Sequence, residues 1–178
     1  MLAAPPVPAA PSPTPAAPSA PARARKKEKT PVGWKEWVEL PELAAGDAGH
    51  DVGGAGLRVR AKVDTGAKTS SLFATDIATF ERDGDMFARF TLPPRPGTDD
   101  PDVACEAELV GDRKVKSSNG VVQLRPVVRT HALVCGRRFP LELTLADRGK
   151  MKFRMLLGRE ALRHRFLVDV GKVWLGGR

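Results

Sequence analysis

Histidine and cysteine are scarce in this sequence. Its 178 residues include three histidines, His50, His131 and His164, and two cysteines, Cys105 and Cys135, which are spread along the chain. A zinc hydrolase needs about three protein ligands, commonly from these residue types, and no H-E-x-x-H or similar spacing supplies them. The side chains could still converge in space, but the sequence itself predicts no metal site. The cysteines are expected to be reduced and partly buried.

A complete phosphate-binding loop is also missing. Gly66-Ala67-Lys68-Thr69 matches the end of such a loop, but the glycine that should precede it is absent. We therefore expect no ATP binding and no cofactor.

Long apolar runs are absent as well. No stretch approaches the length of a membrane span, and residues 1–22 hold 8 of the 16 prolines, which would interrupt the apolar core of a secretory signal. Because proline sustains neither helix nor sheet ladders, we expect an extended tail over residues 1–30, followed by one folded domain over residues 31–178. We expect the protein to be soluble and cytoplasmic, with no membrane partner.

Half of the net charge lies in one short segment. The chain has a formal net charge of +8, and residues 23–29 contribute +4 of it, from five Lys or Arg residues and one Glu. One interpretation is a solvated linker, and the other is a non-specific, salt-sensitive anchor for RNA, DNA or acidic surfaces. The rest of the chain shows no nucleic-acid recognition motif, so we expect no specific nucleic-acid partner.

Helical periodicity is nearly absent, and short strand patterns take its place. Asp83-Gly84 lies between two apolar-alternating runs, which is a strong signal for a β-hairpin. Gly111-Asp112 predicts a further turn, residues 158–163 predict one short helix, and the glycine-rich residues 46–56 predict a mobile loop. Strand-like runs lie at 34–40, 57–63, 75–80, 86–92, 103–110, 121–128, 131–134, 139–145 and 151–157. This pattern indicates an all-β barrel or sandwich.

The run over residues 57–63, which alternates apolar and basic side chains, ends at Asp64-Thr65-Gly66. Gly66 permits a tight turn or the close approach of other atoms, and Thr65 can hydrogen-bond locally and fix the loop. Asp64 would then be held at a strand end with its carboxylate presented outward, as an aspartic protease requires. The alternative is an ordinary turn in which Asp64 bonds to the backbone.

A second segment supports the first interpretation. Met155-Leu156-Leu157-Gly158-Arg159 has two large apolar residues, then Gly and Arg before a short helix, and together with Val63-Asp64-Thr65-Gly66-Ala67 it resembles the retropepsin-like aspartic proteases. Residues 33–41, 62–72, 80–84 and 154–159 look like a bacterial branch labelled as ATP-dependent zinc proteases. The resemblance covers about residues 32–169. It implies a closed β-barrel with a flap hairpin and one short C-terminal helix.

The resemblance also implies the parts of the site. The catalytic loop would consist of Asp64, Thr65 and Gly66. Substrate contacts are expected from Ala67, Lys68 and the flap residues Ser117, Ser118, Asn119 and Gly120. The loop would be supported from behind by Leu156, Leu157, Gly158 and Arg159. Many retroviral members have an acid at the place of Lys68, so a cation there suggests a preference for an acidic peptide, or a salt bridge to a nearby Asp or Glu.

The chain has one Asp-Thr-Gly and is too short for the second copy that pepsin-like enzymes carry. A catalytic pair therefore requires a homodimer, in which Asp64 of each chain meets at the two-fold axis and activates a water for peptide hydrolysis. The competing hypotheses are a non-catalytic peptide- or partner-binding module of the same fold, and a zinc metallopeptidase as the family label says. Family members are linked with ATP-grasp glutamate ligases that modify a ribosomal protein. That link implies such partners, and either an endopeptidase or an enzyme that trims glutamate-rich tails.

Overall fold

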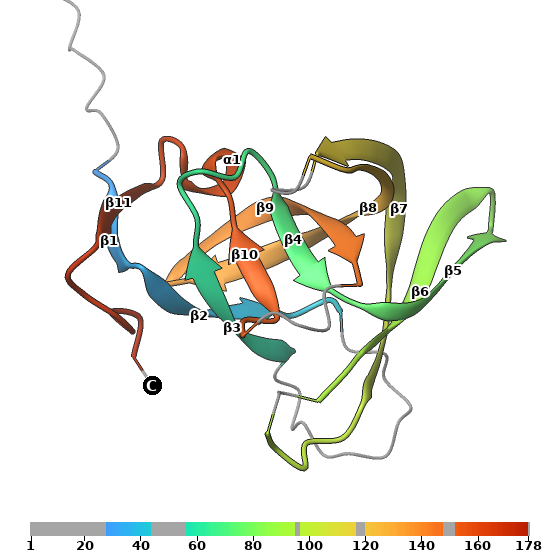
Figure 1. Cartoon of the computed structure of the whole chain (residues 1–178), viewed down its shortest axis with the longest axis horizontal. Helices are drawn as coiled ribbons and strands as arrows, with labels where there is room; N and C mark the ends of the chain where they lie inside the picture. The colour runs from blue at the N-terminus through green and yellow to red at the C-terminus, as the bar shows by residue number, and fades with distance from the viewer. Residues whose placement is uncertain (1–27, 44–55, 95–96, 117–119, 148–151, 178) are drawn as a thin grey trace, which may run out of the picture.

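The computed structural model describes residues 28–43, 56–94, 97–116, 120–147 and 152–177 (Figure 1). The proline-rich tail before residue 28 and nearly all of the glycine-rich loop expected at 46–56 lie outside these residues, as do Ser117, Ser118 and Asn119. The elements are β1 (Thr30–Gly33), β2 (Lys35–Leu40), β3 (Leu57–Val63), β4 (Ser70–Phe73), β5 (Thr75–Arg82), β6 (Asp85–Leu92), β7 (Val103–Lys116), β8 (Val122–Val134), β9 (Arg137–Ala146), β10 (Met155–Leu157), α1 (Arg159–Leu162) and β11 (Phe166–Asp169).

Six of the strands close into a barrel. Their order is β2-β3-β10-β4-β9-β8, and a pairing of Glu39 in β2 with Leu133 in β8 completes the ring. Closure leaves these strands without a free edge for another chain to join. The expected all-β barrel with one short helix is therefore confirmed. Beyond β8 the sheet continues through β7, β6 and β5, which extend away from the barrel (Figure 1).

The barrel interior is built by alternation along the strands. In β3 the side chains of Leu57, Val59, Ala61 and Val63 are buried, and the three basic side chains between them are exposed. Successive side chains of a strand point to opposite faces, so the period of two in this segment fixes which face turns inward. The other large buried side chains include Val38, Leu40, Leu72, Phe90, Leu92, Leu143, Leu145, Met155 and Leu157.

Two hairpins leave the barrel. Between β5 and β6, Asp83 (φ 54°) and Gly84 (φ 87°) are both left-handed, which is the two-residue turn that Asp-Gly favours, so this predicted hairpin is confirmed. The turn expected at Gly111-Asp112 is wrong. Strand β7 continues through Gly111 (φ 141°) with a shift of register against β8. A glycine inside a strand commonly marks such a bulge. The pairing of β7 with β8 therefore continues past Gly111 as far as Lys116.

The two ends of the described chain are joined by a buried carboxylate. β1 pairs in parallel with β11. Beside this pair, Glu36 of β2 is completely buried and accepts hydrogen bonds from the backbone N–H groups of Gly33 (2.6 Å), Leu175 (3.0 Å) and Gly176 (3.2 Å). The segment after β11 is thereby fixed to the barrel. No helix among the described residues is long and apolar enough to cross a membrane.

Candidate active site

The loop that follows β3 is held between two strands that do not pair with each other. β3 and β4, which lead into and out of this loop, both pair with β10: Met155 lies opposite Ala61 in the parallel pair and opposite Leu72 in the antiparallel pair. Figure 1 shows β10 between the two. A three-residue strand thus fixes both ends of the loop that contains Asp64.

The carboxylate of Asp64 is oriented by its own loop. Its Oδ1 accepts hydrogen bonds from the N–H groups of Gly66 (3.0 Å) and Ala67 (3.1 Å). The N–H of Asp64 itself donates to the carbonyl of Leu157 in β10 (2.9 Å). Both bonds that the described residues make to this carboxylate end on Oδ1, and the side chain is only half-buried. These are also the bonds of an ordinary turn, so the surroundings of the loop decide between the two interpretations.

Gly66 packs closely against the carboxylate of Asp64. Its φ is not left-handed, and a Cβ added there would lie 3.2 Å from Oδ1 of Asp64. A side chain at this position would press on the carboxylate. Thr65 is exposed, and its carbonyl, like that of Gly66, accepts a hydrogen bond from Arg159. The glycine therefore leaves room beside Oδ1 of Asp64. The carbonyl of Thr65 connects the loop to α1 through its hydrogen bond from Arg159.

The segment from β10 into α1 binds every carbonyl of the loop from Thr65 to Lys68. The Arg159 guanidinium donates to Thr65 (2.9 Å) and Gly66 (2.7 Å), the Arg159 backbone N–H donates to Ala67 (2.9 Å), and the next N–H along donates to Lys68 (3.1 Å). An unsupported turn would leave these carbonyls to solvent. This backing is what distinguishes the Asp64 loop from a simple surface turn.

Tight packing behind the loop comes from Gly158. A Cβ there would lie 2.4 Å from the carbonyl oxygen of Thr69, so any side chain would force the two segments apart. The Gly158 N–H donates to the hydroxyl of Ser70 (3.0 Å), and the hydroxyl of Thr144 in β9 donates to the Ser70 carbonyl (3.1 Å). Both hydroxyl residues are buried. Leu156 and Leu157, the other two support residues that we expected, are buried in β10.

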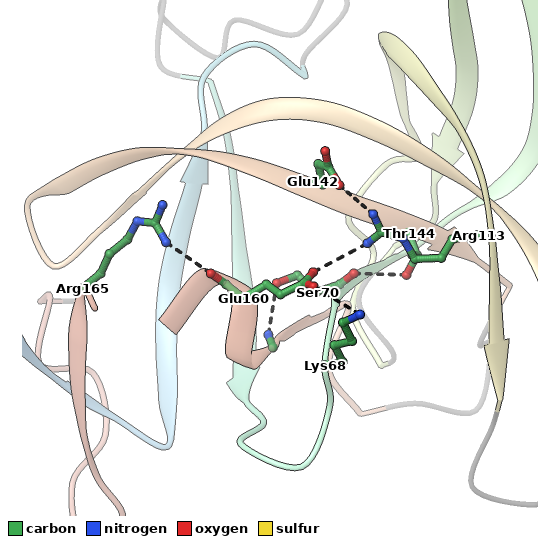
Figure 2. A network of polar contacts seen from close by, with 8 residues as sticks. Lys68, Ser70, Arg113, Glu142, Thr144, Glu160 and Arg165 are labelled. Atoms are coloured by element: carbon green, nitrogen blue, oxygen red, sulfur yellow. Dashed lines mark hydrogen bonds and ion pairs between the residues drawn. The ribbon is translucent and has the colours of Figure 1, made fainter. Parts of the chain in front are cut away.

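Lys68 takes part in an ionic chain that the sequence did not reveal. Its Nζ lies 3.8 Å from Glu160 Oε1, the other oxygen of Glu160 lies 3.6 Å from Arg113 of β7, and Arg113 also lies 2.8 Å from Glu142 of β9 (Figure 2). Of the two alternatives for Lys68, the structure shows the salt bridge. Glu160, Arg113, Ser70 and Thr144 were not predicted, because only the fold brings them to the loop.

The β7–β8 hairpin lies on the same side of the barrel as this loop. The contact of Arg113 with Glu160 joins the hairpin to α1. Of the predicted flap residues, only Gly120 is described, with a left-handed φ of 84°. The role of this hairpin as a flap stays a prediction.

The histidine and cysteine side chains described next do not form a metal site. Among the described residues, no three His, Cys, Asp or Glu side chains lie together as a metal site would need. The Nδ1 atom of His131, in β8, lies 2.8 Å from a carboxylate oxygen of Glu42. Burial raises the pKa of the Cys105 thiol to about 12, and burial together with the charge and a hydrogen bond of Glu36 raises that of Cys135 to about 12. Both thiols are therefore protonated and unreactive at neutral pH.

The chain is similar to two bacterial proteins over most of its length. It is 36% identical over 138 residues to a probable alpha-L-glutamate ligase of Shewanella halifaxensis, and 37% identical to one of Desulfotalea psychrophila. Each match covers 78% of this chain but only 28% and 27% of the relative, so the chain spans little more than a quarter of these proteins.

A solved structure and a family model agree with the fold. A crystal structure of a Legionella pneumophila protein with unknown function matches with a TM-score of 0.67 and 27% identity, and covers 84% of this chain and 99% of that one. The model of the RimB-like family, described as "Retropepsin-like aspartic endopeptidase RimB", matches residues 31–177. The chain therefore belongs to the RimB-like family of retropepsin-like aspartic endopeptidases.

Proposed function

We propose that this protein is an aspartic peptidase in which Asp64 activates a water molecule for hydrolysis of a peptide bond. The observation that supports it most is the loop geometry: Oδ1 of Asp64 accepts two N–H groups of its own loop, and α1 binds the loop carbonyls from behind. The carboxylate is thus fixed in direction and remains accessible. Membership of a family of aspartic endopeptidases agrees with this use of the loop.

The chemistry requires a second carboxylate, and a homodimer would supply it. In such a dimer the Asp64 side chains of two chains face each other across the two-fold axis. Two carboxylates this close cannot both ionise easily, so they share one proton and titrate as a pair. The ionised member takes a proton from the attacking water. The protonated member polarises the scissile carbonyl and afterwards helps to protonate the leaving nitrogen.

The substrate would bind as an extended peptide between the Asp64 loop and the β7–β8 hairpin. An extended segment can pair its backbone with strand edges, as peptides do in other β-proteins. Closure of the hairpin over the peptide would exclude water from the reacting bond. In this arrangement Ala67, Lys68 and the hairpin residues from Ser117 to Gly120 contact the substrate.

The names of the relatives favour a function tied to glutamate ligation. Proteins called probable alpha-L-glutamate ligases contain a region similar to this chain and are much longer. We infer that the chain works in the cytoplasm beside a glutamate ligase, on a peptide or protein that the ligase modifies, either cutting internally or trimming glutamate-rich tails. The same observation supports the second candidate, a non-catalytic module of this fold that binds a ligase or ribosomal partner. A metallopeptidase is the third candidate.

The test is cleavage of a peptide library across acid to neutral pH, by the native chain and by Asp64→Asn, with the mass in solution measured in parallel. We expect cleavage by a dimer, loss of at least about a thousandfold in rate in the variant, and no effect of a chelator. Equal cleavage by both proteins would contradict the aspartic mechanism, and inhibition by the chelator would favour a metal. A monomer that binds peptides without cleaving them would favour the binding module.

A further inference from the structure

Two cations from different parts of the chain converge on one carboxylate beside the Asp64 loop. Lys68 belongs to that loop and Arg113 to the β7–β8 hairpin, and each contacts a different oxygen of Glu160, at 3.8 Å and 3.6 Å (Figure 2). The two cations would repel each other without an anion between them. Glu160 supplies a negative charge between them, and Arg113 also pairs on its other side with Glu142 at 2.8 Å.

The backbone of Glu160 is fixed, but its side chain is free to leave. The backbone N–H donates to the Lys68 carbonyl (3.1 Å) and the carbonyl accepts from Arg165 (3.2 Å). The side chains of Glu160 and Lys68 are 50% and 77% exposed. Ion pairs this exposed stabilise a protein by about 0–1 kcal/mol each, so another carboxylate can replace Glu160 at little cost.

The pair of cations lies where a bound peptide would pass. Lys68 follows Asp64 by four residues on the same loop, so their Cα atoms are at most about 14 Å apart. An extended peptide advances about 3.3 Å per residue, so a side chain within about four residues of the scissile bond can reach Lys68. Arg113 belongs to the β7–β8 hairpin, the other element that the proposed peptide would contact.

We propose that Lys68 and Arg113 form a binding subsite for a side-chain carboxylate of the peptide, and that Glu160 occupies this subsite in the free chain. The inference rests on the proposed function, because it takes the peptide path from it. When a peptide with Glu or Asp at the matching position binds, its carboxylate replaces that of Glu160 between the two cations. Glu160 then imitates the substrate: it competes with peptides that place a carboxylate in the subsite and weakens their binding, and it does not affect peptides that leave the subsite unused.

The experiment measures binding without cleavage. Three labelled peptides, identical except for Glu, Gln or Lys at the central positions, are titrated by fluorescence anisotropy into the full chain carrying Asp64→Asn. Glu160→Gln in this background should tighten the Glu peptide about fivefold and leave the Gln peptide unchanged, because it removes the competing charge. Lys68→Glu and Arg113→Glu should each weaken the Glu peptide at least about tenfold and improve the Lys peptide.

Lys172→Glu is the matched control, since Lys172 is an exposed lysine that pairs with Asp169 (3.5 Å). It should change none of the three affinities by more than about twofold. The proposal is overturned if the three peptides bind alike, or if Glu160→Gln weakens all of them equally, as loss of a structural brace would. Charge-dependent binding with no cleavage by the native chain would instead refute the peptidase and keep the subsite. Cleavage by the native chain without any preference for peptide charge would instead refute the subsite and keep the peptidase.

Discussion

Glu36 and Asp64 each accept more than one backbone N–H group, but they differ in burial and in the segments that they join. Glu36 is completely buried, and its two oxygens accept from Gly33, Leu175 and Gly176. Asp64 is half-buried, and its bonds to the described residues all end on Oδ1, which accepts from two N–H groups of its own loop. The Glu36 carboxylate thus joins segments far apart in the sequence, whereas the described bonds of the Asp64 carboxylate stay within its own turn.

The difference separates a structural carboxylate from a reactive one. A buried carboxylate with satisfied oxygens can be removed only at the cost of the groups that it binds. A carboxylate that is oriented through one oxygen and partly exposed has the second oxygen available for water and substrate. A carboxylate that has one oxygen available, on a loop that is held rigid, therefore indicates function. The following substitutions test that distinction.

The largest expected effect is on stability, from Glu36→Ala. Three N–H groups would lose their acceptor inside the protein, so the free energy of unfolding should fall by at least about 3 kcal/mol. Urea denaturation measures it. Asp64→Asn is the comparison: its amide oxygen can still accept both loop N–H groups, so the loss should stay below about 1 kcal/mol. Equal losses would mean that both carboxylates are structural.

The second effect comes from Gly158→Ala, which tests the rigid support. The new Cβ would lie 2.4 Å from the Thr69 carbonyl oxygen, and this is backbone that cannot move aside cheaply. We expect a loss of about 2 kcal/mol in unfolding free energy and a displaced Asp64 loop with reduced cleavage. Gly171→Ala is the control, since its Cβ would meet only a side-chain oxygen, of Asp169, at 3.3 Å. Native activity in Gly158→Ala would show that the loop needs no such support.

Arg159→Met should have a smaller effect on stability than on activity. The methionine keeps much of the apolar stem but loses the two hydrogen bonds to the carbonyls of Thr65 and Gly66. Because these bonds are exposed, the loss in unfolding free energy should be about 1 kcal/mol. The loop that orients Asp64 becomes looser, so kcat should fall by about tenfold or more while KM changes less. A change in KM alone would show that Arg159 binds substrate and does not position the loop.

The smallest effect concerns the thiol beside Glu36. Burial raises the pKa of Cys135 to about 12, with further contributions from the charge of Glu36 and a hydrogen bond to it. Glu36→Gln removes that charge, so the pKa of Cys135 should fall toward its usual range while burial keeps it above. The pH dependence of alkylation measures this shift, with Cys105, whose pKa is raised by burial, as the internal control. An unchanged profile for Cys135 would show that burial alone acts on it.

The parts of this fold that could be read from the sequence are those with local causes. The alternation from Leu57 to Val63, the Asp83-Gly84 turn and the Gly158-Arg159 helix start all depend on neighbours in the chain. Each signal is complete within a few residues, which is why the all-β class and the position of the Asp64 loop could be predicted from it. The choice of a closed barrel over a sandwich came from the family resemblance.

The parts that were missed depend on distant partners. Glu36 looks like a polar residue on an amphipathic strand, and its acceptance of N–H groups 139 and 140 residues away becomes visible only once β1 and β11 lie together. Arg113 and Glu160 meet for the same reason. Gly111 followed by Asp112 predicts a turn from the sequence, because this pair favours turns, and only the pairing with β8 shows that it forms a bulge.

The most direct test of the central claim, that Asp64 acts as one of a pair, is a mixing experiment. Native chain and Asp64→Asn chain are combined at constant total concentration, allowed to exchange, and assayed for peptide cleavage. If the site consists of two Asp64 carboxylates from two chains, an equal mixture should retain about one quarter of the native rate, because only native pairs are active. A rate of about one half, the value for simple dilution, would contradict the shared site and show that each chain acts alone.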